Sequence, residues 1–182
     1  MKKNTNYKKN DKNKFQGGFT LIETFVAITV LLIAVTGPLV LVTKALSISK
    51  MSKGQTTAIY LAQEAVEYIR NVRDENILNR VYWLENLDEC MELEGDKCKI
   101  NSIDEEVEAC SSDGCRNLSY NSSNYLYGYG LGGSWVESRF KRDVEIIEVT
   151  SNKEVEIIVD MFWSEGPNTV NFSINERLFN WQ

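Results

Sequence analysis

Apolar and polar residues follow three different patterns along this 182-residue chain. The first pattern is an apolar run over residues 19–43, in which Glu23 is the only charge. A helix of this length reaches about 37 Å at a rise of ~1.5 Å per residue, and a bilayer core is ~30 Å thick. The run therefore predicts a transmembrane helix that ends before Lys44.

The second pattern follows Lys44, where apolar residues recur in steps of three, four or seven, as on one face of a helix. Gly54 weakens a helix locally but need not end it. We therefore expect one continuous helix from Phe19 to about Ile77, longer than a domain of this size requires. The apolar face of its second half comprises Met51, Ala58, Ala62, Ala65, Val66, Ile69 and Val72.

The third pattern is the alternation of apolar and polar residues in the last third of the chain, which has the period of a half-buried strand. The turns "TSNK" and "SEGPN" separate three such segments and predict an antiparallel meander. We interpret Trp163 and Trp181 as packing residues. The expected inward residues are Phe140, Val144 and Ile146, then Val155, Ile157, Val159, Met161 and Trp163, and finally Val170, Phe172 and Ile174.

These patterns predict an α+β fold, in which a long protruding N-terminal helix packs on a small antiparallel β-sheet. The first half of the helix is transmembrane, and its amphipathic half covers the apolar face of the sheet. The expected organisation is residues 1–18 as a basic leader, 19–43 as the transmembrane half, 44–78 as the amphipathic half, 79–133 as an acidic cysteine-containing loop region and 134–182 as the sheet.

The loop region, residues 79–133, is acidic and then rich in Gly, Ser and Tyr, which predicts loop with one short strand. It holds all the cysteines, without a C-x-x-C pair, and the chain has no histidine, so we expect no metal site. Calcium binding by the acidic residues is a less favoured alternative, because their spacing fits no EF-hand loop. Disulfides are expected in an exported domain. Of the three possible pairings we favour nearest neighbours, Cys90–Cys98 and Cys110–Cys115.

Charge is distributed unevenly along the chain, which has a net charge of −6. Residues 1–18 carry +5 and the remainder carries −11, which argues against nucleic-acid binding by the acidic body. Lysines flanking a span favour the cytoplasmic side. The lysines are Lys2, Lys3, Lys8, Lys9, Lys12 and Lys14.

Catalytic chemistry has little support in this sequence. Histidine, the commonest general base, is absent, and no phosphate-binding loop, nucleophile elbow or metal signature occurs. We therefore expect neither enzymatic activity nor a cofactor. A membrane-anchored hydrolase that relies on carboxylates, cysteine or serine is a weak alternative.

Ordinary targeting segments explain the apolar run incompletely. A secretory signal peptide has a shorter apolar region followed by a small-residue cleavage site, and neither is found here. A simple anchor explains the length but not Glu23, because an acidic residue at a helix centre costs ~2.5–3.5 kcal/mol on insertion scales. Glu23 lies near one end, so its cost is lower, and a merely interfacial role is an open alternative.

The stretch "KFQGGFTLIETFVAITVLLIAV", residues 14–35, resembles the N-terminal signal of type IV pilins and pseudopilins. The resemblance implies that a prepilin peptidase cuts between Gly18 and Phe19 and that Phe19 becomes the methylated N-terminus. It also implies that Glu23 pairs with the Phe19 amine of a neighbouring subunit in a filament, since a buried charge is tolerated when it is paired.

This chain departs from the family pattern in two places. The family commonly has a glycine where Leu32 stands and a proline where Val40 stands, whereas the proline here is Pro38. A proline inside a helix removes a hydrogen bond and clashes with the carbonyl of Ala34. The resemblance implies a helix that bends or partly melts near Pro38 on assembly.

A second stretch, "AIYLAQEAVEYIRNVRDEN" (residues 58–76), resembles PilV-type minor pilins and I-type minor pseudopilins. Its charged residues have an equally good explanation as the exposed helix pairs Glu67–Arg70 and Arg70–Asp74. The matching residues are Ala58, Leu61, Ala62, Gln63, Glu67, Arg70, Arg73 and Asp74.

Together these resemblances imply a minor subunit of a type IV pilus or of a type II secretion-like filament, placed in its initiating or tip complex. The implied partners are other major and minor pilin subunits, the prepilin peptidase, a membrane assembly platform and the lipid bilayer, without nucleic acid. The implied location is the inner membrane, crossed once, with the C-terminal domain outside the cytoplasm. The alternative is a single-pass anchored adhesin or receptor domain without a filament role.

Overall fold

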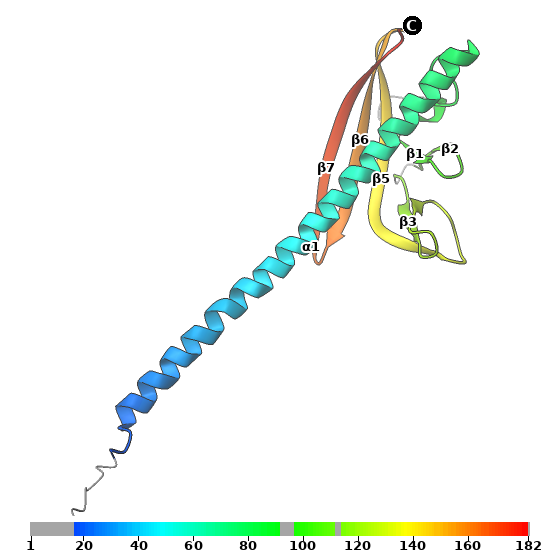
Figure 1. Ribbon diagram of the computed structural model, residues 1–182. Coiled ribbons are helices and arrows are strands. Elements are labelled where there is room, and N and C mark those ends of the chain that lie inside the picture. The colour runs from blue at the N-terminus through cyan, green and yellow to red at the C-terminus, as the bar shows by residue number, and fades with distance from the viewer. Residues whose placement is uncertain (1–16, 92–96, 112–113, 182) are drawn as a thin grey trace, which may run out of the picture. The chain divides into compact units, whose positions relative to one another are not determined.

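The computed structural model describes residues 17–91, 97–111 and 114–181 (Figure 1). The chain divides into an N-terminal unit, Met1–Ser47, and a C-terminal unit, Ile48–Gln182, which are described separately. The elements assigned within the described residues are the helix α1 (Leu21–Asn79), the short 3₁₀ helix η1 (Asp88–Cys90) and the strands β1 (Cys98–Asn101), β2 (Glu106–Ala109), β3 (Asn117–Asn121), β4 (Tyr127–Gly128), β5 (Trp135–Thr150), β6 (Glu154–Glu165) and β7 (Asn168–Phe179).

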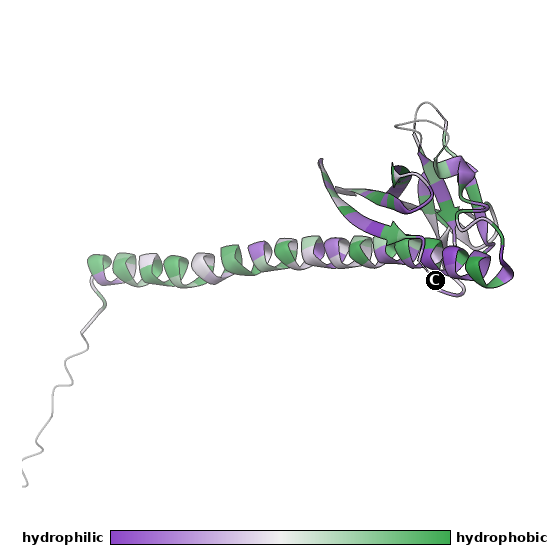
Figure 2. Ribbon diagram, turned by 90° about the horizontal axis from the view of Figure 1, so that it is seen from above, coloured by the Kyte–Doolittle hydropathy of each residue, from purple (hydrophilic) through white to green (hydrophobic). Residues whose placement is uncertain are grey.

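The N-terminal unit consists, in its described part, of a short non-helical lead and the apolar half of α1. The helix begins at Leu21 and continues without interruption through Pro38, although this proline has no N–H to donate to the Ala34 carbonyl. Figure 2 shows that hydrophobic residues dominate the early turns of α1 and that hydrophilic residues become frequent later. The long helix predicted from the apolar periodicity is therefore confirmed.

In the C-terminal unit, the second half of α1 packs against the sheet through mostly small side chains. Alanine and glycine at these positions let the helix and sheet approach closely. The contact begins at Gly54, so Met51, which is 48% exposed, lies outside it, contrary to the sequence prediction. Val72 is only partly buried. The buried residues of α1 are Gly54, Ala58, Leu61, Ala62, Ala65, Val66, Ile69 and Asn76.

The predicted meander is present as the antiparallel strands β5, β6 and β7. Their register places Val144 opposite Val159, and Val159 opposite Ile174. Every second residue of β6 from Val155 to Trp163 is buried, as the alternating sequence predicts. The fold class is α+β, and the second half of the long N-terminal helix packs on this small antiparallel sheet.

The region expected to be mostly loop contains four short strands, so that prediction is wrong. Strands β1 and β3 pair with the edge of β5 opposite to β6, and β2 and β4 extend the sheet beyond them. The sheet therefore starts at Cys98 rather than near residue 134. Charged residues such as Lys99 and Glu108 occupy these short strands, so neither hydrophobicity nor length marks them in the sequence.

A buried arginine joins three elements in the core of the C-terminal unit. The Arg142 side chain of β5 is 1% exposed and donates hydrogen bonds to the carbonyls of Leu61 in α1 and Ile100 in β1. Tyr129 lies beside it and donates to the Arg142 carbonyl at 3.5 Å. Burial raises the pKa of the Tyr129 hydroxyl, which keeps it protonated and able to donate.

Candidate functional site

The start of α1 places Glu23 in a capping arrangement. The backbone N–H of Glu23 donates to the Thr20 carbonyl at 3.1 Å and to the Thr20 hydroxyl oxygen at 3.3 Å. Thr20 is thus the N-cap residue, and Glu23 is the third residue of the helix. A carboxylate in the first turn is stabilised by the helix dipole. The T-x-x-E spacing in the sequence carries this signal, which the sequence-based interpretation did not use.

The predicted processing bond, Gly18–Phe19, lies before the helix begins. Gly17 and Gly18 are exposed, and a methyl group added to either would meet no atom within 4 Å. The Phe19 side chain is 80% exposed. Non-helical, exposed backbone is the form of chain that proteases accept. The rest of the predicted leader, residues 1–16, lies outside the described residues.

In the apolar half of α1, the hydroxyl groups of the threonines form hydrogen bonds within the helix itself. Each hydroxyl donates to a backbone carbonyl three or four residues earlier in the same helix, so it needs no partner outside the helix. Glu23 differs, because it makes no ion pair within the described part of the chain. The threonine hydrogen bonds are Thr24 to Leu21 (2.8 Å), Thr29 to Val26 (2.8 Å), Thr36 to Leu32 (2.8 Å) and Thr43 to Val40 (2.9 Å).

Among the described residues, α1 is the one helix that is long and apolar enough to cross a membrane. The apolar window of this helix has no buried residue. The segment is therefore a candidate single membrane span, consistent with single-pass anchoring. Pro38 lies within it, and the bending or melting expected there concerns assembly, which remains a prediction.

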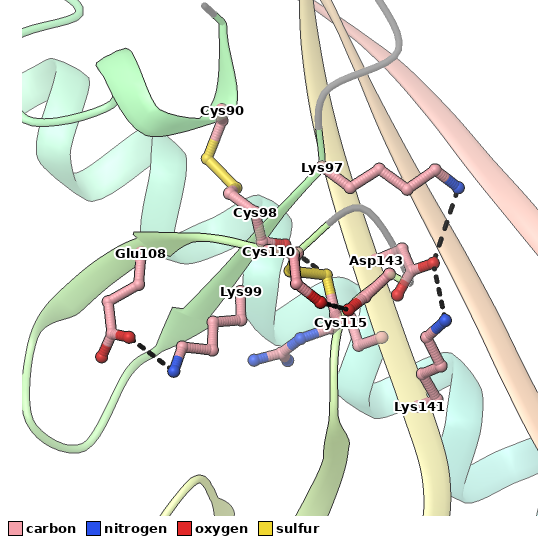
Figure 3. The surroundings of a disulfide bond; sticks show 12 residues. Cys90, Lys97, Cys98, Lys99, Glu108, Cys110, Cys115, Lys141 and Asp143 are labelled. Carbon is pink, nitrogen blue, oxygen red and sulfur yellow. Dashed lines mark hydrogen bonds and ion pairs between the residues drawn. A yellow bond between two sulfur atoms is a disulfide. The ribbon is translucent and has the colours of Figure 1, made fainter.

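The cysteines form the two nearest-neighbour disulfides, Cys90–Cys98 and Cys110–Cys115 (Figure 3). The predicted pairing is therefore confirmed. The two bridges lie side by side, because the Cys115 sulfur is 3.4 Å from the Cys98 carbonyl oxygen. Cys90 and Cys98 are fully buried in the core, whereas Cys110 is partly exposed. The first bridge anchors β1 to η1, and the second holds the segment that leads into β3.

A buried carboxylate faces this cysteine-containing segment (Figure 3). Asp143 of β5 pairs with Lys97 at 3.5 Å and with Lys141 at 3.3 Å, and Lys97 also reaches Asp160 at 3.1 Å. Burial alone would lower the pKa of Lys97, but its hydrogen bond to Asp160 and the charges of Asp143 and Asp160 outweigh this and raise it. The lysine therefore stays charged, and its ion pairs connect the residue directly before β1 to β5 and β6.

In the described part of the chain, no three His, Cys, Asp or Glu residues are arranged to hold a metal ion. The acidic stretch considered for calcium includes Glu92, Glu94 and Asp96, which lie outside the described residues. The calcium alternative is therefore untested at those positions.

The motif over residues 58–76 divides into a buried and an exposed part. Ala58, Leu61 and Ala62 lie in the core. Arg70 pairs with Glu67 at 3.3 Å and with Glu176 of β7, and not with Asp74 as expected, because Asp74 pairs with Arg73. The charged residues thus make surface ion pairs, including one from the helix to the sheet. Such pairs contribute little to stability individually.

Comparisons of this chain with protein families, with curated proteins and with solved structures found no match.

Proposed function

We propose that this protein is a minor subunit of a type IV pilus or of a type II secretion-like filament. The observation that carries the proposal is the start of α1, where an exposed, non-helical Gly18–Phe19 bond precedes an apolar helical stretch, residues 21–43, whose single charge, Glu23, lies in the first turn. This is the arrangement that the pilin-like sequence signal implies. The resemblance of residues 58–76 to minor pilins favours a minor subunit in the initiating or tip complex.

In the proposed mechanism, a prepilin peptidase cuts after Gly18 and leaves the entire span attached. The cut creates a positive amine at Phe19, next to a helix N-terminus that already carries partial positive charge. In the bilayer Glu23 lies near the cytoplasmic rim of the span. In a filament it moves among apolar helices, where a carboxylate needs a cation, and the Phe19 amine of the adjacent subunit supplies it.

The proposed location is the inner membrane, with the C-terminal unit outside the cytoplasm. Lysines of the leader remain on the cytoplasmic side of a span. The two disulfides support the same orientation for the sheet, since disulfides persist in oxidising compartments. The proposed partners are the other pilin subunits, the peptidase, the assembly platform and the bilayer.

A single-pass adhesin or receptor domain without a filament role is the alternative. It explains the span and the disulfides, and it leaves Glu23 with only its place in the first turn of the helix. It also predicts that the bond between Gly18 and Phe19 stays intact. The two proposed functions therefore make opposite predictions about cleavage of the Gly18–Phe19 bond.

The test is N-terminal sequencing and intact mass measurement of the protein extracted from its native membrane. We expect a mature chain that begins at Phe19 and carries an N-methyl group. Gly18→Val should accumulate as full-length precursor, whereas Gly17→Ala, which changes the other exposed glycine, should be processed normally. A mature chain that begins at Met1, or a Gly18→Val variant that is trimmed normally, contradicts the proposal.

A further inference from the structure

Residues 117–136 carry no charge, although they lie in a unit with strong net charge. Residues 48–182 contain 13 basic and 24 acidic residues, yet this 20-residue segment consists mainly of Tyr, Ser, Asn and Gly. It forms β3, β4, the turn between them and the loop that leads into β5. A neutral, aromatic surface in an acidic domain is the first sign of a binding site.

The turn between β3 and β4 holds Tyr125 in a strained conformation. The φ angle of Tyr125 is 64°, which is unusual for a bulky residue. Two asparagines stabilise the turn: Asn121 accepts from the Ser123 N–H at 2.9 Å, and Asn124 accepts from the Leu126 N–H at 3.2 Å. The Tyr125 side chain is 74% exposed. Such local strain occurs at binding and catalytic sites, where it presents a side chain in a fixed position.

A continuous series of aromatic contacts connects this turn to the core. The ring centroids of Tyr125 and Tyr120 are 6.4 Å apart, those of Tyr120 and Tyr127 are 5.2 Å apart, and those of Tyr127 and Phe140 are 5.8 Å apart. Phe140 then contacts the buried Trp163 at 6.5 Å. The exposed tyrosine therefore rests on a rigid base, and little conformational entropy is lost when a ligand stacks on it.

A groove of about 380 Å³ lies beside these rings, between α1 and the start of β5. The two charged groups of β5 that line it already have partners: Glu137 accepts from Asn117 at 2.8 Å, and Arg139 pairs with Glu165 at 2.6 Å. Its lining includes Lys53, Thr57, Tyr120, Tyr127, Val136 and Ser138. The groove thus combines aromatic faces with hydroxyl and amine groups.

We propose that this groove and Tyr125 bind a neutral glycan. The apolar face of a sugar ring stacks on tyrosine, while its hydroxyls both donate and accept hydrogen bonds. The Thr57 hydroxyl already donates to the Lys53 carbonyl at 3.0 Å, and the Ser138 oxygen already accepts from the Phe140 N–H at 3.2 Å. Thr57 can therefore accept from a sugar, and Ser138 and the amine of Lys53 can donate to it.

A phosphate or another polyanion would need several unpaired cations, and the net negative charge of residues 48–182 disfavours it. The volume of the groove is within the range of small-ligand sites. A stable protein complex instead buries a broad surface area, which a groove of this kind does not supply. The proposal is independent of the filament role.

The test is calorimetric titration of the purified full-length chain in micelles of a detergent without a sugar headgroup, because a glycoside detergent would compete. The probes are maltotetraose, cellotetraose, chitotetraose and, as a charged control, tetragalacturonic acid. We expect at least one neutral tetrasaccharide to bind with a Kd of about 1 mM or tighter, and tetragalacturonic acid to bind more weakly. Tyr125→Ser should weaken binding about fivefold.

Tyr60→Ser is the matched control, because Tyr60 is a similarly exposed tyrosine, at 67%, on α1 outside the groove. This variant should bind like the original chain. Val136→Asp, which adds a carboxylate to the groove wall, should weaken binding without lowering the thermal unfolding midpoint. The proposal is overturned if none of the neutral tetrasaccharides binds at a concentration of about 10 mM, or if tetragalacturonic acid binds more tightly than they do. It is also overturned if Tyr60→Ser and Tyr125→Ser lose the same affinity for the neutral sugar. The glycan proposal is also overturned if none of the sugars binds and a partner protein is found to cover Tyr125 instead.

Discussion

The guanidinium of Arg142 donates a hydrogen bond to the carbonyl oxygen of Leu61 at 2.5 Å, which links the centre of the sheet directly to the backbone of α1. Its second nitrogen donates to the Ile100 carbonyl at 2.6 Å. Glu64 lies 3.9 Å away, at the edge of the buried site. One side chain therefore connects the helix, β5 and the short strand β1.

Replacing Arg142 tests this connection. Arg142→Met keeps the approximate volume but removes every donor, so we expect the free energy of unfolding to fall by about 2–4 kcal/mol. Arg142→Lys keeps one charged donor group on a shorter side chain, so its free energy of unfolding should lie between those of the original chain and Arg142→Met. The measurement is urea unfolding of the full chain, followed by tryptophan fluorescence. A Met variant as stable as the original would show that burying the charge cancels its hydrogen bonds.

Gly54 is predicted to be required for close packing of the helix on the sheet. A methyl group at this position would lie 2.9 Å from Nε1 of the buried Trp163 and 3.0 Å from Nη2 of Arg139. Gly54→Ala should therefore lower the free energy of unfolding by about 1 kcal/mol, although alanine is the better helix former by about that amount. Thr56→Ala, at an exposed position of the same helix, is the control and should change it by less than about 0.5 kcal/mol. A more stable Gly54→Ala variant would contradict the packing argument.

The two disulfides should differ in their resistance to reduction. Graded reductant followed by thiol labelling and mass spectrometry should label Cys110 before Cys90, because Cys110 is partly exposed and Cys90 is fully buried. Replacing Cys90 and Cys98 together by alanine should cost about 2–4 kcal/mol. The matching double replacement of Cys110 and Cys115 removes a bridge with a sequence separation of 5 rather than 8, and it should cost less. Simultaneous labelling of both bridges would contradict this order.

Glu23 is predicted to act in assembly rather than in membrane insertion. Glu23→Ala should insert and be cleaved, yet be lost from sheared filaments, because removing one partner of a buried pair typically costs ~3–5 kcal/mol. Glu23→Asp should assemble less well than the original chain, since its shorter side chain reaches less far. Recovery is measured by immunoblotting of the filament fraction.

Two further variants separate the charge of Glu23 from its place in the helix cap. Glu23→Gln keeps the size of the side chain and removes only its charge, so it should also be lost from filaments. Thr20→Ala removes the capping hydroxyl, which costs about 1 kcal/mol, and should leave recovery much less affected. Wild-type recovery of Glu23→Ala would mean that the glutamate is only an interfacial residue.

The elements with strong periodicity were predictable from the sequence. The helix and the strands β5, β6 and β7 each repeat their pattern over 12 residues or more. Strands β1 and β2 have four residues each. β1 is placed by its pairing with β5 and by the disulfides, and β2 by its pairing with β1, rather than by their own composition. The sequence of a four-residue strand does not indicate which other strand it will pair with.

The candidate site was predictable in part, for different reasons at each residue. Gly18, Phe19 and Glu23 lie in one contiguous stretch that resembles the pilin signal, and their roles remain predictions. Arg142 was missed, although it shares the inward parity of Phe140 and Val144 on β5, and an arginine at an inward strand position is the sign that was available. Asp143 has outward parity and is buried by Lys97 and the cysteine-containing segment, so only the tertiary structure reveals it.

The internally bonded threonines of the apolar helix have a thermodynamic consequence. Because each of these hydroxyls is already bonded within α1, the side chains between Glu23 and Lys44 present a largely apolar surface to their surroundings. Moving such a segment from lipid tails to the flanks of similar apolar helices would replace one apolar environment by another, so the hydrophobic effect favours neither. If the segment moves from a bilayer into a filament, as proposed, interactions at its charged end, where Glu23 lies, decide between the two locations.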